Sequence, residues 1–130
     1  LNIGDDNMNF RLTTTKETEE RLVFLQSVTG LTWNVLSRIA VALSLRDPSL
    51  PESVKNKTAG KITIPRNVMT GEFDYIFKAL IRQHAKRNVP DEEYFPDLFN
   101  AHLERGIRLL ENEYKHAGNY EKLLQNLLNF

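Results

Sequence analysis

The chain has 130 residues, of which 41% are apolar and 26% charged, and this length and balance fit one globular domain. It contains no cysteine, which excludes disulfide bonds, thiolate zinc sites, iron–sulfur clusters and thiol nucleophiles. Lys plus Arg and Asp plus Glu both number 17, so the net charge favours no class of partner. The first residues lack the pattern of a signal peptide, and no apolar stretch reaches the roughly 18 residues of a membrane span. We therefore expect a soluble, cytoplasmic protein without membrane contact.

The first 15 residues predict a polar end followed by a short strand. Residues 1–7 are polar and are expected to be disordered. The next residues alternate with the period of a half-buried strand: Met8, Phe10 and Leu12 on one face and Asn9, Arg11 and Thr13 on the other. A single strand cannot satisfy its own backbone groups, so this pattern argues for pairing with a second copy of the chain.

Two helices and a long loop follow the strand. The first helix is predicted over residues 16–29, where Gly30 ends it, and the second from Thr32, as N-cap, to about Arg46. Residues 48–60 are polar and rich in turn formers, which predicts a functional loop or hinge. Residues 61–64 are expected to be a short extended piece.

The second half of the chain predicts further helices. A third helix over residues 73–87 is expected to turn five apolar side chains inward: Phe73, Ile76, Phe77, Leu80 and Ile81. A fourth is expected to have Pro96 in its first turn, and Gly106 inside it suggests close packing. The tail, residues 120–130, forms a leucine stripe too short to stand alone in water. The expected organisation is a polar end over residues 1–7, a helical domain over 8–117 and an amphipathic helix over 118–130.

The order strand, helix, tight turn, helix is the layout of a ribbon-helix-helix unit, in which two chains pair their strands. The fold class we predict is therefore mainly α, with such a unit extended by two to three helices into an oligomeric bundle. In that layout Asn9, Arg11 and Thr13 can read base edges. The free amides near Thr32 and Trp33 can hold a phosphate. The alternative is that the strand only covers the core and Trp33 only covers the inter-helix turn.

The charge is concentrated in the middle of the chain. Residues 51–90 carry 8 basic and 3 acidic side chains, whereas residues 91–130 carry 4 and 8. From residue 55 to 71 there is no acid, and the cations there are Lys55, Lys57, Lys61 and Arg66. On the third helix Lys78, Arg82 and Lys86 lie four apart along one side. This pattern predicts a phosphate-binding surface, although a charge run can also be a solvated face.

Signals for catalysis or cofactors are weak. His84, His102 and His116 are scattered at spacings unlike a metal-binding helix motif, and we expect them at the surface or at an interface. The run Ala59-Gly60-Lys61 lacks the first glycine and the final Ser or Thr of a phosphate loop. The expected protein is not an enzyme and has neither metal nor cofactor.

Two segments resemble the DndE family of the bacterial DNA phosphorothioation machinery. One is residues 29–40, T-G-L-T-W-N-V-L-S-R-I-A, followed by L-S-L at 43–45; the other is residues 99–107, which contain the pattern A-H-x-x-R-G. The resemblance runs from about Phe10 to Leu110 and leaves out the tail beyond Gly118. It implies a small helical subunit, tetrameric, that binds nicked double-stranded DNA through surface lysines. Its implied partners are a cysteine desulfurase, a sulfur-transfer enzyme and an ATPase.

On this resemblance we expect the basic residues of the middle segment to contact DNA: Lys55, Lys57, Lys61 and Arg66, with Lys78 and Arg82 as supporting phosphate contacts. Two other functions stay open. One is a dimeric repressor that reads operator DNA through Asn9, Arg11 and Thr13. The other is a protein-interaction module without DNA contact, which docks through the leucine-striped tail.

Overall fold

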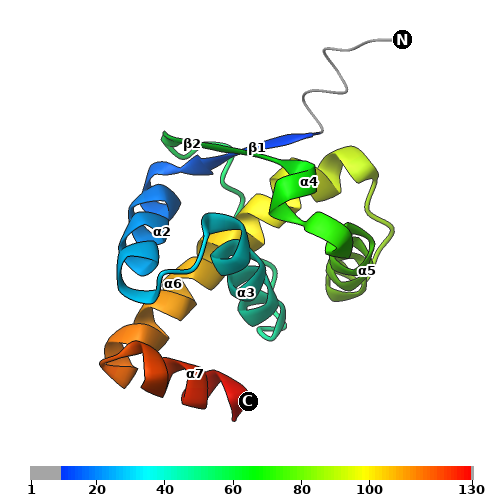
Figure 1. The fold of residues 1–130 in the computed structure, drawn as a ribbon. Helices are drawn as coiled ribbons and strands as arrows, with labels where there is room; N and C mark the ends of the chain where they lie inside the picture. Colours follow the sequence, from blue (N-terminus) through cyan, green and yellow to red (C-terminus); the bar gives the residue numbers. More distant parts are fainter. Residues whose placement is uncertain (1–9, 130) are drawn as a thin grey trace.

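The computed structural model describes residues 10–129, a mainly helical chain with one two-stranded sheet (Figure 1). The elements in chain order are β1 (Arg11–Thr15), α2 (Lys16–Thr29), α3 (Trp33–Leu45), β2 (Ala59–Pro65), α4 (Arg66–Met69), η1 (Gly71–Phe73), α5 (Asp74–Ala85), η2 (Glu93–Leu98), α6 (Phe99–Ala117) and α7 (Tyr120–Leu128). The predicted fold class, mainly helical with a strand and two helices at its start, is confirmed. The expected disorder of residues 1–7 and the strand positions Met8 and Asn9 lie outside the described residues.

The strand β1 pairs within its own chain. It runs antiparallel to β2, with Leu12 opposite Ile64 and Thr13 opposite Thr63, and the register shifts between Thr13 and Thr15. The extended piece predicted at residues 61–64 is therefore longer than expected and is the missing partner. The expectation that the strand needs a second copy was wrong, because its backbone groups are satisfied by a segment more than 40 residues away.

The ends of α2 lie where local signals place them. The Thr15 hydroxyl accepts a hydrogen bond from the Thr18 N–H at 3.1 Å, which caps the helix start. Gly30 has a φ of 74° and its N–H donates to the Gln26 carbonyl, which ends the helix. Within residues 10–129 no single helix is long and apolar enough to cross a membrane; α2 and α3 pass on length and composition only as a pair, bent by 110°.

Helix α6 forms the axis of the fold and packs closely on α3 (Figure 1). The contact is closest at Gly106, where a Cβ atom would lie 1.7 Å from the Ala40 carbonyl oxygen. The close packing predicted from this glycine is confirmed. Phe95 has an extended backbone (φ −133°, ψ 127°) and breaks the helical path within η2, and the helical backbone that runs on into α6 resumes at Pro96, as the first-turn position predicted for this proline requires.

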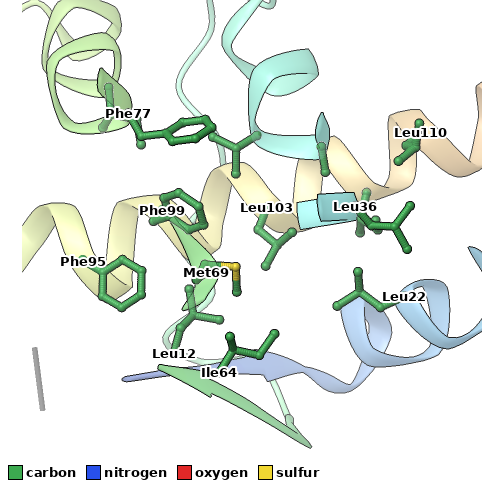
Figure 2. Packing of buried hydrophobic residues seen from close by; sticks show 14 of the residues in the cluster. Leu12, Leu22, Leu36, Ile64, Met69, Phe77, Phe95, Phe99, Leu103 and Leu110 are labelled. Atoms are coloured by element: carbon green, nitrogen blue, oxygen red, sulfur yellow. The ribbon is translucent and has the colours of Figure 1, made fainter. Parts of the chain in front are cut away.

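The core joins the inner face of the sheet to the helices. Figure 2 shows apolar side chains from β1, β2, α2, α3, α4, α5 and α6 meeting around α6. Its largest members are fully buried: Tyr94, Phe95, Phe99, Leu12, Leu22, Leu25, Leu36, Met69, Ile81, Leu103, Ile107 and Leu110. The sheet therefore has one face in the core and the other in solvent.

Helix α5 lies at the edge of this core (Figure 1) and buries only part of its predicted inner face. Phe77 and Ile81 are buried, but Phe73, Ile76 and Leu80 are 48%, 53% and 42% exposed. The prediction that all five point inward was wrong for these three. A helix that meets its neighbours along one narrow line buries residues four apart and leaves the flanking ones in solvent.

The leucine-striped tail docks on its own chain. Helix α7 begins at Asn119, whose side chain accepts from the Lys122 N–H at 2.8 Å, and it packs against α6. Leu123 is buried and Leu127 is partly buried against the core, whereas Leu124 and Leu128 are 40% and 84% exposed. One half of the apolar stripe therefore docks within the chain, and the other half faces solvent.

Candidate nucleic-acid interface

The loop between α3 and β2 carries two of the predicted DNA contacts. Lys57 Nζ lies 2.5 Å from Glu104 Oε2, and the buried Glu104 also accepts from the Thr15 hydroxyl at 2.6 Å. The hydrogen bond to this carboxylate raises the pKa of Lys57. Lys55 Nζ lies 3.3 Å from Asp97, but both side chains are exposed, so this ion pair is weak. Lys57 therefore attaches the loop to α6, whereas Lys55 remains available to an outside partner.

Arg66 is buried rather than part of a mobile basic loop. Its guanidinium forms bidentate hydrogen bonds of 2.8–2.9 Å with both Asp74 and Asp91. It also lies over the rings of Tyr94 and Phe95, 5.1 and 5.3 Å from their centroids. Through this pairing Arg66 holds the pKa of Asp91 well below its usual range. Four of the five guanidinium N–H groups are thus committed inside the protein.

The cations of α5 turn toward the segment that follows the helix. Lys78 Nζ donates to Asp91 at 2.8 Å, and Arg82 Nε donates to the Val89 carbonyl at 3.0 Å. Lys86 lies beyond the last turn of α5 in a left-handed conformation. The three cations therefore do not form the continuous row that their spacing predicted.

Lys61 and Arg11 differ from the other candidates. Both lie on the solvent face of the sheet, and within the described residues neither side chain has an ion pair or a hydrogen bond to a partner. The backbone N–H of Lys61 donates to Glu19 Oε1 at 3.2 Å, which fixes the strand but not the ammonium group. Asn9 lies outside the described residues.

The charge pattern along the chain missed the acids that neutralise the basic segment. These carboxylates lie at the start of α5 or later in the chain: Asp74, Asp91, Asp97 and Glu104. Counting charges over a segment detects only acids within that segment, whereas these ion pairs join residues that are 8 to 47 positions apart. The excess of acids in residues 91–130 was the signal that could have revealed them.

Two of the three histidines, His84 and His102, form a small polar cluster that sequence reasoning did not expect. His102 is 1% exposed, and its ring meets that of His84 edge to face at 4.9 Å. The Arg105 Nε–H donates to the Ser44 hydroxyl, which is hydrogen-bonded to His102 Nδ1 at 2.8 Å. Placing His102 at the surface was wrong. Burial, with smaller effects of His84 and Arg105, lowers the pKa of His102 to about 3.

This burial predicts a pH-dependent stability. The unfolded chain binds a proton at His102 below about pH 6.5, and the native chain does so only near pH 3, so stability falls as the pH drops through this window. At pH 5 the expected loss is about 2 kcal/mol. Urea unfolding at pH 7.5 and pH 5 measures it, and His102→Gln should remove this part of the pH dependence. His116→Gln, on the exposed end of α6, should keep it.

Arg105 and Gly106, the other residues of the A-H-x-x-R-G pattern, also face α3. Arg105 donates to the Ser44 carbonyl and to the Ser49 carbonyl, each at 2.8 Å, and so caps the C-terminal end of α3. Gly106 allows the backbones of α6 and α3 to touch at Ala40. The residues of this pattern therefore pack α6 against α3.

The start of α3, which we predicted as a phosphate site, borders a hollow of about 300 Å³ next to β2 and α4. The Thr32 side chain makes no capping hydrogen bond there. Trp33 is partly buried and packs against the core, which agrees with its predicted role of covering the turn. Phosphate binding at these amides stays a prediction.

A larger hollow of about 500 Å³ opens beside the start of α2. Its charged side chains are of both signs, with Lys16 and Lys57 facing Glu17, Glu20 and Glu104. A phosphate group is best held where one sign of charge dominates, so this hollow suits it less well than an unopposed basic surface. Within residues 10–129 no three His, Asp or Glu side chains are grouped as metal ligands.

Comparison with known proteins places the fold in a family. The family described as DNA sulphur modification protein DndE matches residues 11–118. A solved structure of DndE from Escherichia coli B7A, involved in DNA phosphorothioation modification, is 23% identical, with a TM-score of 0.63, and covers 78% of this chain and 96% of its own. A DndE mutant with two glycines changed to lysine is 21% identical, with a TM-score of 0.62, and covers 79% and 97%. No curated protein matches significantly.

The family match begins at the first residue of β1 and ends just after α6, so it spans all of the elements except α7. The resemblance seen in residues 29–45 and 99–107 is thereby confirmed. This chain belongs to the DndE family of DNA sulphur modification proteins.

Proposed function

We propose that this chain is a non-catalytic DNA-binding subunit of a DNA phosphorothioation machinery. It contacts the backbone of nicked double-stranded DNA and serves, as a homotetramer, as a scaffold for sulfur insertion by other proteins. Those partners are a sulfur-transfer enzyme, a cysteine desulfurase and an ATPase. The observation that carries the proposal is the family match over residues 11–118.

The composition supports this division of labour. Carrying sulfur as a persulfide requires a cysteine thiolate, and the sequence has no cysteine. The sulfur chemistry therefore belongs to the partners, and positioning of DNA to this subunit. A nick suits such a role because a broken strand bends at a lower elastic cost, so several copies can hold DNA on both sides of the break.

The packing narrows the set of cations that the sequence predicted as DNA contacts. We propose that Lys55, Lys61 and Arg11 meet phosphates, because their side chains are exposed and the last two have no partner within the described residues. Four other cations support the surface through the internal bonds described above: Lys57, Arg66, Lys78 and Arg82.

The test is binding of the purified protein to intact, nicked and single-stranded DNA of one sequence and of a scrambled sequence. We expect duplex binding that weakens steeply with salt, does not depend on sequence and is tighter for the nicked duplex. The molar mass is recorded in the same buffer. Strong sequence dependence by a dimer would instead identify a repressor, and no binding to any DNA would identify a protein-interaction module.

A further inference from the structure

The sheet presents a narrow polar surface to solvent. Along β1 and β2 the apolar side chains point into the core, and the alternate residues point outward. We call the outward set the ribbon face: Arg11, Thr13, Lys61 and Thr63, all exposed. In Figure 1 this sheet lies at one end of the molecule, away from α7.

The ribbon face is basic, and its two cations make no ion pair within the described residues. Neither strand contains Asp or Glu, and the side chains of Arg11 and Lys61 have no partner within residues 10–129. Arg66, the residue that follows β2, differs from these two cations because it is paired with two carboxylates. The Glu19 carboxylate lies beside the Lys61 end of the face, where it accepts from the backbone N–H of Lys61 and makes no ion pair with the ammonium group.

The centre of the ribbon face can donate and accept hydrogen bonds. Thr13 and Thr63 are opposite each other in the register, and their Oγ1 atoms lie 2.9 Å apart. One hydroxyl donates to the other, so one O–H group and several lone pairs remain for an outside partner. Because both side chains are β-branched they stand in fixed rotamers on the strands.

The spacing of these groups fits a DNA groove. Arg11 and Lys61 lie at opposite ends of the face, each two residues from the central threonine pair. At about 3.4 Å per residue they are roughly 14 Å apart along the ribbon. A two-stranded ribbon enters the major groove, which is about 12 Å wide and is bordered by phosphates on both sides.

We propose that the ribbon face is the surface through which this chain contacts duplex DNA, with the ribbon seated in the major groove. Arg11 and Lys61 contact phosphates on the two sides of the groove, and the Thr13 and Thr63 hydroxyls lie between them. This inference rests on the proposed function and names its site. The charge complementarity between a polyanion and a basic strip whose cations make no ion pair within the described residues favours DNA over an apolar protein partner.

The test compares two double variants that remove the same charge. In Arg11→Gln/Lys61→Gln two phosphate contacts are lost, so the log–log salt slope of duplex binding should fall by about 1.8 and the affinity at 0.1 M salt by at least about tenfold. The matched control is Arg108→Gln/Lys122→Gln, which removes two exposed cations from α6 and α7. The control should keep the wild-type slope.

A third variant separates hydrogen bonding from charge. Thr13→Val/Thr63→Val keeps the shape and strand propensity of both residues and removes the hydroxyls. We expect an affinity loss of about fivefold with an unchanged salt slope. Circular dichroism and thermal unfolding of all three variants should match the wild type, because the altered side chains are exposed.

The outcomes distinguish the inference from the proposed function. If the wild type binds duplex DNA and the ribbon variants bind equally well, the inference is wrong and the proposed function stands. If ribbon and control variants lose affinity equally, net charge alone explains binding and the ribbon face is not the site. If the wild type binds no DNA, the proposed function fails and the inference fails with it.

Discussion

Replacing Gly106 by alanine is expected to lower the free energy of unfolding by at least about 3 kcal/mol. The added Cβ atom would lie 1.7 Å from the carbonyl oxygen, 2.3 Å from the carbonyl carbon and 2.9 Å from the Cα of Ala40. These are backbone atoms of α3, so no side chain can move aside to make room. The helices α3 and α6 must separate, which opens the core along its longest contact.

Urea unfolding of Gly106→Ala beside Asn112→Ala tests this. Asn112 is exposed on the same helix, and its replacement should change stability by no more than about 0.5 kcal/mol. In an exposed helix interior, glycine to alanine stabilises by about 1 kcal/mol. The sign of the effect is therefore diagnostic: a more stable Gly106→Ala protein would show that α3 and α6 do not touch at this point.

Structural features that depend on a few neighbouring residues could be predicted from the sequence. The helix end at Gly30 and the close packing at Gly106 each depend on one residue type in a short context, and both were confirmed. The register of β1 and β2 could not be predicted in the same way. A strand partner lies more than 40 residues away, and nothing in either strand specifies which other strand it meets.

The candidate site was harder to predict than the fold, because charge is neutralised in space rather than along the chain. Lys57 finds Glu104 across 47 residues, and Arg66 finds Asp91 across 25. From the sequence all basic residues of the middle segment looked alike. The packing separates them into internal ion pairs and a few exposed cations, and only a folded structure supplies that distinction.

The two segments that carried the family resemblance turn out to contact each other. Residues 29–45 include α3 and residues 99–107 begin α6, and the pairs Ala40 with Gly106 and Ser44 with His102 join them. Their patterns therefore describe how the core is assembled. They identify the fold reliably, and for the same reason they say little about which surface residues meet DNA.

Replacing Arg66 by methionine is expected to lower the free energy of unfolding by about 3 kcal/mol. The substitution removes four hydrogen bonds and leaves Asp74 and Asp91 facing each other without their shared cation. The two carboxylate side chains are 31% and 41% exposed, so water compensates part of the loss. Thermal unfolding near neutral pH measures the effect.

Two further variants show whether this loss of stability comes from the bidentate geometry of Arg66 or from its charge. Arg66→Lys keeps the cation but cannot bind two carboxylates in bidentate fashion, so we expect a loss of roughly 1–2 kcal/mol. In Arg66→Met/Asp74→Asn/Asp91→Asn both carboxylate charges are gone, and stability should recover in part, less the ion pair that Lys78 makes with Asp91. Because its N–H groups are committed internally, Arg66→Met kept below its unfolding temperature should bind DNA with the wild-type salt slope. A slope lower by about 0.9 would mean that Arg66 leaves its carboxylates to contact a phosphate.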